Sequence, residues 1–436
     1  MTYIFHPYTM AYARRRIAVA VSGGVDSSVA AYLLREHDLV GLHMRNWNSE
    51  DEDEPHCQQQ DTRDAELVCR SLKIPLHRVS FAAEYWTGVF EPFIEGISQG
   101  HMPNPDVRCN SIVKFGAMKD YAKKRLGIDW IATGHYARLW NKDTDNMPPC
   151  ISQILEKEPW LTSWGTAPLL LSGADPSKDQ SYFLAGVEGR AFQNVLFPLG
   201  DLYKSCSKTD SLSVRELAKQ AQLPTAKKRE SMGICFVGKR REFADFIAQY
   251  LLKPPQPGVF IDVDTGEIVG HHQGSFLKTI GQGARIPGAS QKWFVVGRVN
   301  HDETSLLVCK GTNHPALFSD SLSLRHIHWI GGSLPPLLLS TGRMRAMCRI
   351  RHLQPLVSCD IMYDPVDGYI LRFDRPVRAI APGQVAAIYV GEGLVCLGGG
   401  AIWERGPTYH ELGADLPLEL HPPGHNNDLS IRKEYG

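Results

Sequence analysis

Hydrophobic and polar positions follow two different patterns along this chain, and the change comes near residue 240. In the first half, short β-branched runs at residues 17–21, 39–44 and 130–133 alternate with stretches of helical spacing, such as residues 65–72. Strands that alternate with helices indicate a parallel α/β sheet. Ligands of such sheets bind at the carboxyl ends of the strands, so we expect the functional site there.

The second half has the pattern of an all-β structure. Residues 259–263 and 267–269 flank the turn sequence Asp264-Thr265-Gly266, which predicts a hairpin. Short alternating runs follow, separated by Pro and Gly, at residues 293–299, 305–309, 345–351, 369–373 and 384–390. We therefore predict an α/β domain over 17–238, a small β-rich central domain over 239–308 and a C-terminal β-barrel over 309–405. The polar, proline-containing segments 141–167 and 406–436 are expected to be irregular, as an insertion and a disordered tail.

Composition narrows the function classes. The 436 residues suggest two or three domains, and 47 Lys+Arg balance 47 Asp+Glu, so a nucleic-acid surface must come from local clustering of charge. No apolar run approaches the roughly 18 residues that span a bilayer, so we expect no membrane partner. The ten cysteines include no CxxC pair, which disfavours zinc ribbons and iron–sulfur clusters and predicts reduced thiols without a tightly bound metal.

The N-terminus is a candidate targeting segment. Residues 1–16 contain no Asp or Glu and end in Arg14-Arg15-Arg16, a pattern similar to a transit peptide. A leader without a targeting role fits the same residues. We expect a mitochondrial protein, with a cytoplasmic one as the alternative if the source is bacterial.

The sequence Ser22-Gly23-Gly24-Val25-Asp26-Ser27-Ser28 stands between a predicted strand and a predicted helix. A glycine-rich loop in this place presents backbone N–H groups and a helix N-terminus to an anion, and Ser27 and Ser28 are expected to cap the helix. The Walker A pattern is absent. The loop therefore predicts phosphate binding of another kind, with an ordinary strand-to-helix turn as the alternative.

Two cysteines lie beside charged residues rather than in the apolar stripe of a predicted helix or strand. Cys109 follows Asp106 by three residues and Arg108 by one, so a carboxylate and a cation are expected near its thiol. Cys235 is flanked by six bases, Lys227, Lys228, Arg229, Lys239, Arg240 and Arg241. Such flanks favour both a thiolate and contact with phosphate. Inert buried thiols are the alternative.

The glycine loop resembles the SGGxDS signature of the PP-loop ATP pyrophosphatases, which cleave ATP between the α and β phosphates and adenylate an oxygen of their substrate. Further stretches at 43–47, 81–86, 104–110, 132–138, 178–184 and 233–236 make the chain, from about residue 15 to 400, similar to the tRNA-specific 2-thiouridylases of bacteria and mitochondria. The resemblance implies a PP-loop catalytic domain of the adenine nucleotide alpha-hydrolase kind. It also implies a small central domain and a C-terminal β-barrel that helps to hold tRNA.

Residue roles follow from the resemblance, position by position. The positions that match the ATP site are Ala20, Val21, Ser22, Gly23, Gly24, Val25, Asp26, Ser27, Ser28, Met44 and Gly134. The positions that match tRNA contacts are Asn104, Pro105, Asp106, Lys178, Asp179, Gln180, Arg351 and His352, where the family usually has Arg-Tyr for the last pair. The catalytic positions are Cys109, Cys235 and Asp106.

The activity that the resemblance implies is ATP-dependent thiolation of the wobble uridine of tRNA at C2. ATP with Mg²⁺ would adenylate O2, a persulfide on Cys235 would deliver sulfur, and Cys109 would form a disulfide with Cys235 as AMP departs. Asp106 is the candidate for proton transfer. The expected partners of this monomer are the tRNA anticodon loop and a persulfide donor or carrier protein fed by a cysteine desulfurase. Two alternatives stay open: a PP-loop enzyme that uses a nitrogen nucleophile, and a non-catalytic tRNA-binding protein.

Overall fold

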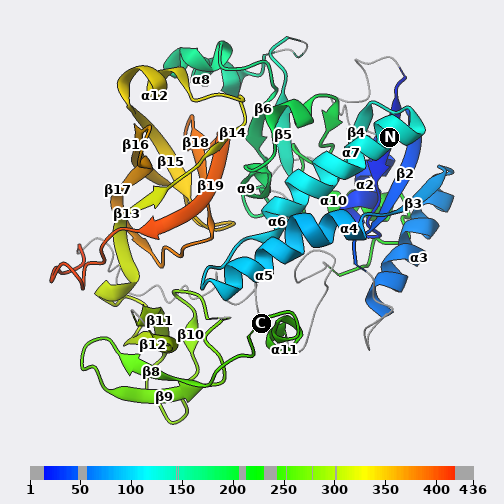
Figure 1. Ribbon diagram of the computed structural model, residues 1–436. Coiled ribbons are helices and arrows are strands. Elements are labelled where there is room, and N and C mark those ends of the chain that lie inside the picture. The colour runs from blue at the N-terminus through cyan, green and yellow to red at the C-terminus, as the bar shows by residue number, and fades with distance from the viewer. Residues whose placement is uncertain are drawn as a thin grey trace.

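The computed structural model describes residues 14–47, 56–143, 145, 147–205, 213–229, 243–251, 253–276, 278–299 and 302–417. Three bodies are evident in Figure 1: a parallel sheet with its helices, a β-barrel beside it, and a smaller β-rich domain below the barrel. These are the α/β, central β-rich and C-terminal barrel parts that the sequence predicts, so the predicted fold class is confirmed.

The N-terminal sheet is parallel throughout and has the strand order β3-β2-β1-β4-β7. Its strands are β1 (Arg16–Ala20), β2 (Asp38–Arg45), β3 (Leu76–Ser80), β4 (Trp130–Ala132) and β7 (Val195–Leu196). Successive residues of β1 point to opposite faces, and each face is covered. Ile17 and Val19 pack in one apolar cluster while Ala18 packs in another, so the central strand is buried on both sides, as parallel sheets require.

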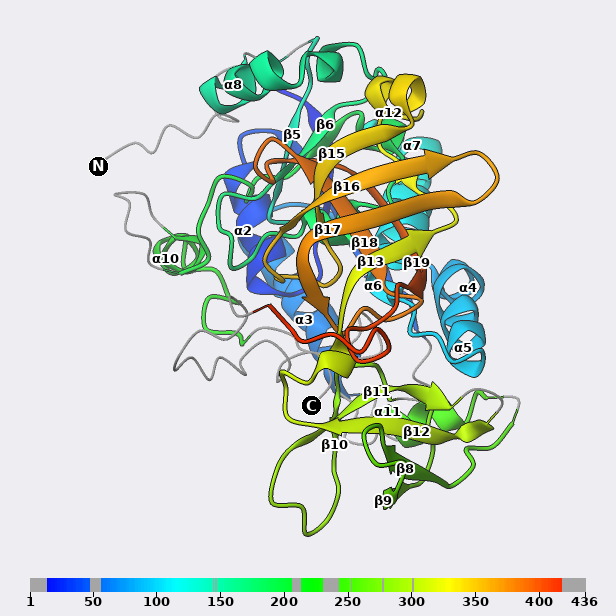
Figure 2. The same cartoon turned by 90° about the vertical axis from the view of Figure 1, so that its left-hand side faces the viewer.

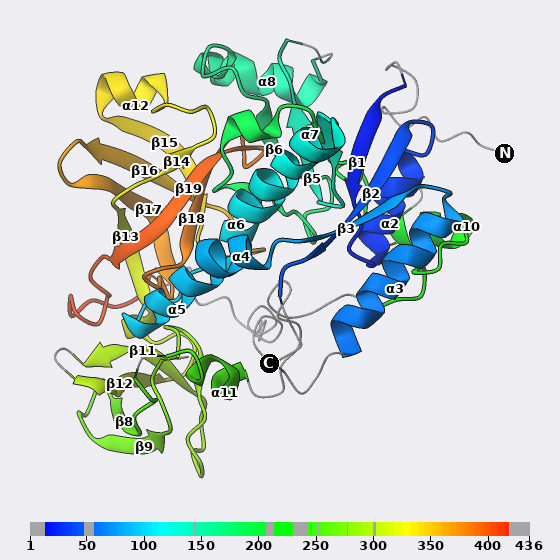
Figure 3. The same ribbon diagram turned by 45° about the vertical axis from the view of Figure 1, so that its right-hand side comes forward.

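Helices cover the two faces of this sheet. Figure 3 shows α2 (Val25–Leu33) and α3 (His56–Ser71) on one side and the long helices that contain α4 to α7 on the other. The other helical elements of the first half are α4 (Ala82–Tyr85), η1 (Trp86–Phe90), α5 (Glu91–Ser98), α6 (Pro105–Arg108), η2 (Cys109–Met118), α7 (Lys119–Leu126), α8 (Pro149–Lys157), η3 (Pro159–Thr162), α9 (Ser181–Leu184), η4 (Gly189–Phe192) and α10 (Val214–Gln220). Both η1 and η2 have π-helical hydrogen bonding.

The C-terminal barrel closes through strand β13, which pairs with β17 on one side and with β19 on the other. Figure 2 shows β15, β16 and β17 side by side across the front of the barrel. The strands are β13 (Phe318–Leu324), β14 (His328–Trp329), β15 (Arg343–Arg349), β16 (Val357–Asp364), β17 (Gly368–Arg378), β18 (Val385–Val390) and β19 (Val395–Arg405), with η5 (Pro315–Leu317) and α12 (Pro336–Thr341) between them. Alternate residues of β15, namely Met344, Ala346 and Cys348, face the core.

A hairpin from the first half of the chain extends this barrel sheet. Strand β5 (Ala137–Trp140) pairs with β6 (Leu169–Ser172), and β6 pairs with β19 through Leu170 and Leu171. The catalytic domain and the barrel therefore share one sheet, an arrangement that local sequence patterns do not reveal.

The central domain has the strand order β10-β11-β12-β8-β9 and is preceded by α11 (Phe243–Ala248). Its strands are β8 (Gly258–Asp262), β9 (Ile268–His272), β10 (Gly283–Ala284), β11 (Trp293–Val299) and β12 (Asp302–Lys310). The predicted hairpin is present as β8 and β9, and Gly266 has the positive φ of 73° that its turn needs.

Of the two segments predicted to be irregular, one contains a helix and the other packs on a neighbouring domain. The insertion 141–167 contains α8, and the side chains of Ile151, Ile154 and Leu161 are buried in the core of the barrel. Residues 406–417 lie against the central domain, where Leu416 is buried. The prediction of an irregular segment was wrong for 141–167, because α8 has an amphipathic face and packs it on the barrel. Residues 406–417 form no helix and no strand beyond an isolated bridge at Thr408, and residues 418–436 lie outside the described part of the chain, so the disordered tail stays a prediction. No helix in the described part of the chain is long and apolar enough to cross a membrane.

Candidate functional site

The glycine loop joins β1 to α2 at the carboxyl edge of the parallel sheet. Gly24 is the N-cap residue of α2, and no side chain caps this helix end. Gly23 has φ +81°, and a Cβ atom there would lie 2.2 Å from the carbonyl oxygen of Asp61. Only glycine fits this position, because both the backbone conformation and the space exclude a side chain.

The hydroxyl groups of Ser27 and Ser28 donate to the carbonyl oxygen of Gly24, at 3.1 and 2.7 Å. The prediction that they cap the helix is therefore wrong: they bond backwards along the loop and fix its shape. Because these hydroxyls bond backwards, the N-terminal end of α2 stays open to a ligand. Among the described residues, no side chain accepts from the first amide N–H groups of α2, and uncapped amides at a helix N-terminus attract an anion.

The other residues predicted for the ATP site lie at the ends of the neighbouring strands. Gly134 follows β4, and a Cβ atom on it would lie 2.8 Å from the amide nitrogen of Ser27, so glycine lets β4 approach the loop. Ala20 ends β1, and the N–H of Val21 donates to Leu42 at 2.8 Å. Met44 is half-buried near the end of β2.

A lysine with no recognised sequence signal lies at the loop. The Lys204 side chain is 4% exposed, and its Nζ donates to Oδ1 of Asp26 at 2.6 Å. The hydroxyl of Tyr136 donates to the same oxygen at 2.8 Å. Asp26 and Lys204 are 178 residues apart in sequence, so only the fold brings them together.

Lys228 also lies at the loop, where its ammonium group clamps two elements together. Its Nζ donates to the Gly23 carbonyl oxygen at 2.9 Å, to Asp61 at 2.7 Å and to Asp64. Burial alone would lower the pKa of Lys228, but the bonds to both carboxylates outweigh it and the pKa is raised. The ammonium group that the sequence predicts for phosphate contact is thus engaged by the loop and α3.

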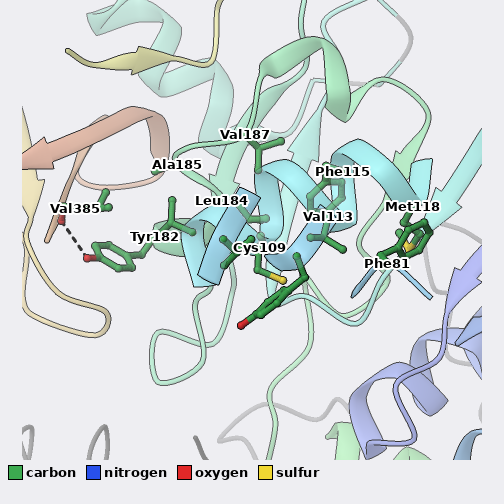
Figure 4. Close-up of a cluster of buried hydrophobic side chains, with 14 of the residues drawn as sticks. Phe81, Cys109, Val113, Phe115, Met118, Tyr182, Leu184, Ala185, Val187 and Val385 are labelled. Atoms are coloured by element: carbon green, nitrogen blue, oxygen red, sulfur yellow. Dashed lines mark hydrogen bonds between the residues drawn. The ribbon is translucent and has the colours of Figure 1, made fainter. Parts of the chain in front are cut away.

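Cys109 is the first residue of η2 and is 1% exposed. The preceding α6 begins at Pro105, and the Asn104 side chain caps it by accepting from the N–H groups of Asp106 and Val107 at 3.1 and 3.3 Å. Figure 4 shows Cys109 within a cluster of buried apolar side chains. The thiol is therefore shielded in this conformation, while Asp106 is half-buried.

Arg108 does not turn toward the cluster around Cys109. Its side chain is exposed, and its Nε donates to the Gly88 carbonyl oxygen in η1 at 2.8 Å. The positive charge that the sequence predicts beside the thiol is bonded to the neighbouring helix.

A short chain of contacts connects Cys109 with the loop. The side-chain N–H₂ of Asn110 donates to the Asp106 and Phe183 carbonyls, which leaves Oδ1 to accept from Nε2 of His135 at 3.1 Å. The other ring nitrogen of His135 then accepts from Thr133 at 2.7 Å. Burial lowers the pKa of His135 well below its usual value, so the ring is neutral. His135 directly follows Gly134, which packs on Ser27.

Five of the predicted tRNA-contact residues, which come from two domains, meet at one place: Lys178, Asp179, Gln180, Arg351 and His352. Asn104, Pro105 and Asp106 lie apart from them, at the start of α6. Asp179 is buried, and its carboxylate accepts from Arg349 at 3.1 Å and from the Ser181 hydroxyl at 2.9 Å. Nε2 of His352 bonds to the carbonyl oxygen of Asp179 at 2.8 Å, and Arg351 donates to the carbonyls of Arg378 and Ala379.

Lys178 and Gln180, on either side of Asp179, are half-buried, and the Gln180 side chain accepts from the Tyr136 N–H at 3.0 Å. The structure thus brings the pair Arg351-His352 to the segment 178–180, and it turns the Asp179 carboxylate into the protein rather than toward a ligand.

Cys235 and the bases at 239–241 lie outside the described residues, so their predicted roles stay predictions. The chain that leads to Cys235 is described up to residue 229. It is fixed at the loop, where Thr225 donates to the Ser28 hydroxyl at 2.9 Å and Lys228 holds Gly23. No disulfide joins two cysteines of the described part of the chain.

The loop offers a carboxylate and uncapped amide groups to a ligand. Among the described residues no three Cys, His, Asp or Glu side chains are placed to hold a metal ion. Asp26 is a half-buried carboxylate of the loop itself, and open amides lie beside it. Oxygen ligands from one carboxylate and from phosphates are what Mg²⁺ prefers.

Three family models match the three bodies. The tRNA methyl transferase HUP domain matches residues 15–239, the tRNA methyl transferase PRC-barrel domain matches 244–310, and the aminomethyltransferase β-barrel domain matches 319–402.

Similar proteins cover nearly the whole chain. The mitochondrial tRNA-specific 2-thiouridylase 1 of Drosophila melanogaster is 39% identical over 396 residues, which is 90% of this chain and 95% of that protein. The tRNA-specific 2-thiouridylase MnmA of Klebsiella pneumoniae is 40% identical over 406 residues, 91% of this chain and 99% of that protein. The MnmA of Yersinia pestis is 40% identical over 403 residues, with coverages of 90% and 97%. With this identity over this length, the chain belongs to the family of tRNA-specific 2-thiouridylases.

Proposed function

We propose that this protein uses ATP to replace the C2 oxygen of the wobble uridine in tRNA anticodons with sulfur. The observation that carries the proposal is the chain of contacts from Cys109 through Asn110, His135 and Gly134 to Ser27. It joins a cysteine to a phosphate-binding loop at one edge of the sheet. The names of the similar proteins give the substrate class and the reaction.

The loop would bind the ATP phosphates through the open amides of α2, with Asp26 as the carboxylate for Mg²⁺. Lys204, which bonds to Asp26, is the cation that we propose for the developing pyrophosphate charge. ATP supplies the adenylate that makes uridine C2 electrophilic and AMP a leaving group. Unpaired loop nucleotides reach such a site at little cost, because few base pairs must be broken.

The sulfur step balances with two cysteines. The terminal sulfur of a Cys235 persulfide attacks C2, and AMP leaves with the former O2. The Cys109 thiolate then attacks the inner sulfur of Cys235, which releases the thiouridine and leaves a Cys109–Cys235 disulfide. If Cys109 attacks the persulfide first, the released hydrosulfide attacks C2 and the same products form. A dithiol reductant supplies two electrons to restore both thiols.

Asp106 is the proposed proton-transfer group, because it lies one helical turn before Cys109. Burial of Cys109 requires that the start of η2 open when tRNA binds. A π-helical start suits such a change, since π-helical turns are frequent at functional sites.

The segment that carries Cys235 leaves the loop region at Lys228. Seven residues of extended chain span at most about 25 Å, so Cys235 is within reach of the phosphate loop. The proposed tRNA contacts Asn104, Pro105, Lys178, Gln180, Arg351 and His352 complete the substrate site, with Asp179 supporting them from inside.

The partners follow from the chemistry. A persulfide donor or carrier protein must load Cys235, and one copy of the chain contains every proposed group, which supports a monomer. The absence of Asp and Glu from residues 1–16 and the mitochondrial relative support a mitochondrial location. Imaging of a C-terminally tagged protein would test this location.

Two alternatives predict different products. A PP-loop enzyme with a nitrogen nucleophile has no use for the paired cysteines, and a non-catalytic tRNA-binding protein has no use for the open loop amides. Nucleoside mass spectrometry of tRNA incubated with the protein, ATP and a persulfide donor distinguishes the proposed enzyme from both alternatives, because only the proposed enzyme yields 2-thiouridine.

The decisive variant is Cys235→Ser. It should abolish 2-thiouridine while it retains part of the tRNA-dependent AMP formation, because activation precedes sulfur transfer. Cys109→Ser should also stop turnover, and oxidation of the wild type with tRNA and ATP should link Cys109 to Cys235 in a peptide map. The exposed thiol of Cys150 in α8 is the matched control, and Cys150→Ser should remain active. Wild-type amounts of 2-thiouridine in Cys235→Ser would reject the persulfide role.

A further inference from the structure

Asp26 of the glycine loop is held by one of its two carboxylate oxygens. Oδ1 accepts from the Tyr136 hydroxyl at 2.8 Å and from Nζ of Lys204 at 2.6 Å. No described residue bonds to Oδ2, and the side chain is 35% exposed. The two donors thus fix the direction of the carboxylate and leave one oxygen for a ligand. A Mg²⁺ ion that arrives with ATP would take this oxygen, because carboxylate oxygens are among its preferred ligands.

Both donors are buried, and both are tied to the segment 175–180. Tyr136 is 2% exposed, and its backbone makes two hydrogen bonds with Gln180. The Tyr136 N–H donates to Oε1 of Gln180 at 3.0 Å, and the Tyr136 carbonyl oxygen accepts from the Gln180 N–H at 2.8 Å. The N–H of Lys204 donates to Oδ2 of the buried Asp175 at 2.9 Å. Two separate connections therefore lead from this segment to the carboxylate of the glycine loop.

The same segment carries predicted tRNA contacts, namely Lys178 and Gln180. The N–H of Lys178 donates to the Asp175 carbonyl oxygen at 3.0 Å, so residues 175–178 form one turn. An RNA that orders or shifts this segment acts directly on the residues that hold Tyr136 and Lys204. In each connection only one residue stands between the segment and Asp26.

We propose that Tyr136 and Lys204 transmit tRNA binding at 178–180 to Asp26, so that tRNA and Mg²⁺-ATP strengthen each other's binding. This inference rests on the proposed function and adds to it a control on when ATP is bound. An RNA that orders the segment fixes both donors in advance, and a nucleotide that binds afterwards loses less conformational entropy. The coupling is reciprocal, because both ligands share one thermodynamic cycle. Tyr136 is a positioning residue with no other role in the mechanism, so it is the residue to change.

The test measures binding of the α,β-methylene analogue of ATP, which resists cleavage between the α and β phosphates, at one fixed Mg²⁺ concentration. In the wild type, saturating tRNA should raise the affinity for this analogue about tenfold. Tyr136→Phe removes the hydroxyl and keeps the ring. It should reduce the increase to less than about threefold, while tRNA binding without nucleotide stays unchanged. Tyr32→Phe is the matched control and should show the coupling of the wild type, because Tyr32 lies in α2 with Asp26 and no described residue bonds to its hydroxyl.

A second measurement needs no variant. The analogue with Mg²⁺ should raise the affinity of the wild type for tRNA by the same factor of about ten. No coupling in the wild type, or full coupling in Tyr136→Phe, would overturn the proposal. An affinity of Tyr136→Phe that is lowered equally with and without tRNA would also overturn it, because Tyr136 would then orient Asp26 without responding to RNA. Failure of the wild type to bind either ligand or to form 2-thiouridine would instead reject the proposed function itself.

Discussion

The ammonium nitrogen of Lys228 lies 2.9 Å from the carbonyl oxygen of Gly23, although 205 residues separate the two in sequence. The same nitrogen binds Asp61 and Asp64 of α3. One side chain thus fixes the glycine loop, the helix beside it and the start of the segment that leads to Cys235. We infer that Lys228 positions the loop rather than contacting tRNA.

Lys228→Met should raise the KM for ATP about tenfold, which corresponds to about 1.4 kcal/mol of lost loop positioning. It should also lower the free energy of unfolding by about 1–3 kcal/mol, because two carboxylates lose their partner. Pyrophosphate release and chemical denaturation measure the two effects.

The salt dependence of tRNA binding separates positioning from phosphate contact. Lys228→Met should leave the slope unchanged, and Lys219→Met, at an exposed lysine of α10, should change neither KM nor stability. If Lys228→Met reduced the slope of the salt dependence by about one unit, or had the KM of the wild type, Lys228 would be a tRNA-binding base rather than a positioning residue.

Gly134→Ala should impair ATP binding more than folding. The added methyl would lie 2.8 Å from the Ser27 nitrogen, so the loop must shift away from β4. Overpacking of this kind costs about 1–3 kcal/mol, which predicts ATP affinity lowered about tenfold or more. Gly297→Ala is the control, because a Cβ atom there meets nothing within 4 Å. ATP titration of both variants checks the prediction, and unaltered affinity in Gly134→Ala would contradict the close approach.

Asp179 and Arg349 should be strongly coupled in stability. Their side chains are 3% and 11% exposed, and the pair joins the catalytic domain to the barrel. Removal of one partner leaves a buried charge without its counter-ion and should lower the free energy of unfolding by about 3–5 kcal/mol. The double variant Asp179→Asn plus Arg349→Met should therefore lose less stability than the sum of the two single variants.

The matched control is the pair Arg343 and Asp360, which also involves β15 and whose side chains are 65% and 27% exposed. Its double-mutant cycle should give less than about 1 kcal/mol. Denaturant titration of each variant measures both couplings. Additive effects at Asp179 and Arg349 would show that the pair does not tie the domains together.

His135 should make the protein less stable as the pH falls. Burial lowers the pKa of His135 in the folded protein, whereas the unfolded chain titrates near 6.5. Below about pH 6.5 the unfolded state binds the extra proton, so stability is complete above that pH and declines by up to about 1.4 kcal/mol per pH unit below it.

The neutral variant His135→Gln should show a shallower decline. Unfolding free energies of both proteins between pH 5 and 8 test this, since other buried histidines contribute equally to the two. Parallel curves would mean that His135 is not the titrating group.

The sequence alone determined the order of the elements and the place of the glycine loop between a strand and a helix. The apolar runs at 17–21, 39–44 and 130–133 lie in β1, β2 and β4 and their immediate continuations, because a strand buried on both faces needs a continuous apolar run. The hairpin at 264–266 was also predictable, since Asp and Gly supply turn conformations by themselves. In both cases the signal is local.

Only the tertiary structure decided which polar groups meet. Nothing near Lys204 or Lys228 in the sequence indicates that their ammonium groups bond to Asp26 and Gly23, and the hydroxyls of Ser27 and Ser28 bond backwards where local rules predict caps. The insertion 141–167 is helical because its apolar side chains are buried on the barrel. Contacts between distant segments depend on how the sheet edges and helix faces come together, and the energy of those contacts is absent from any short window of sequence.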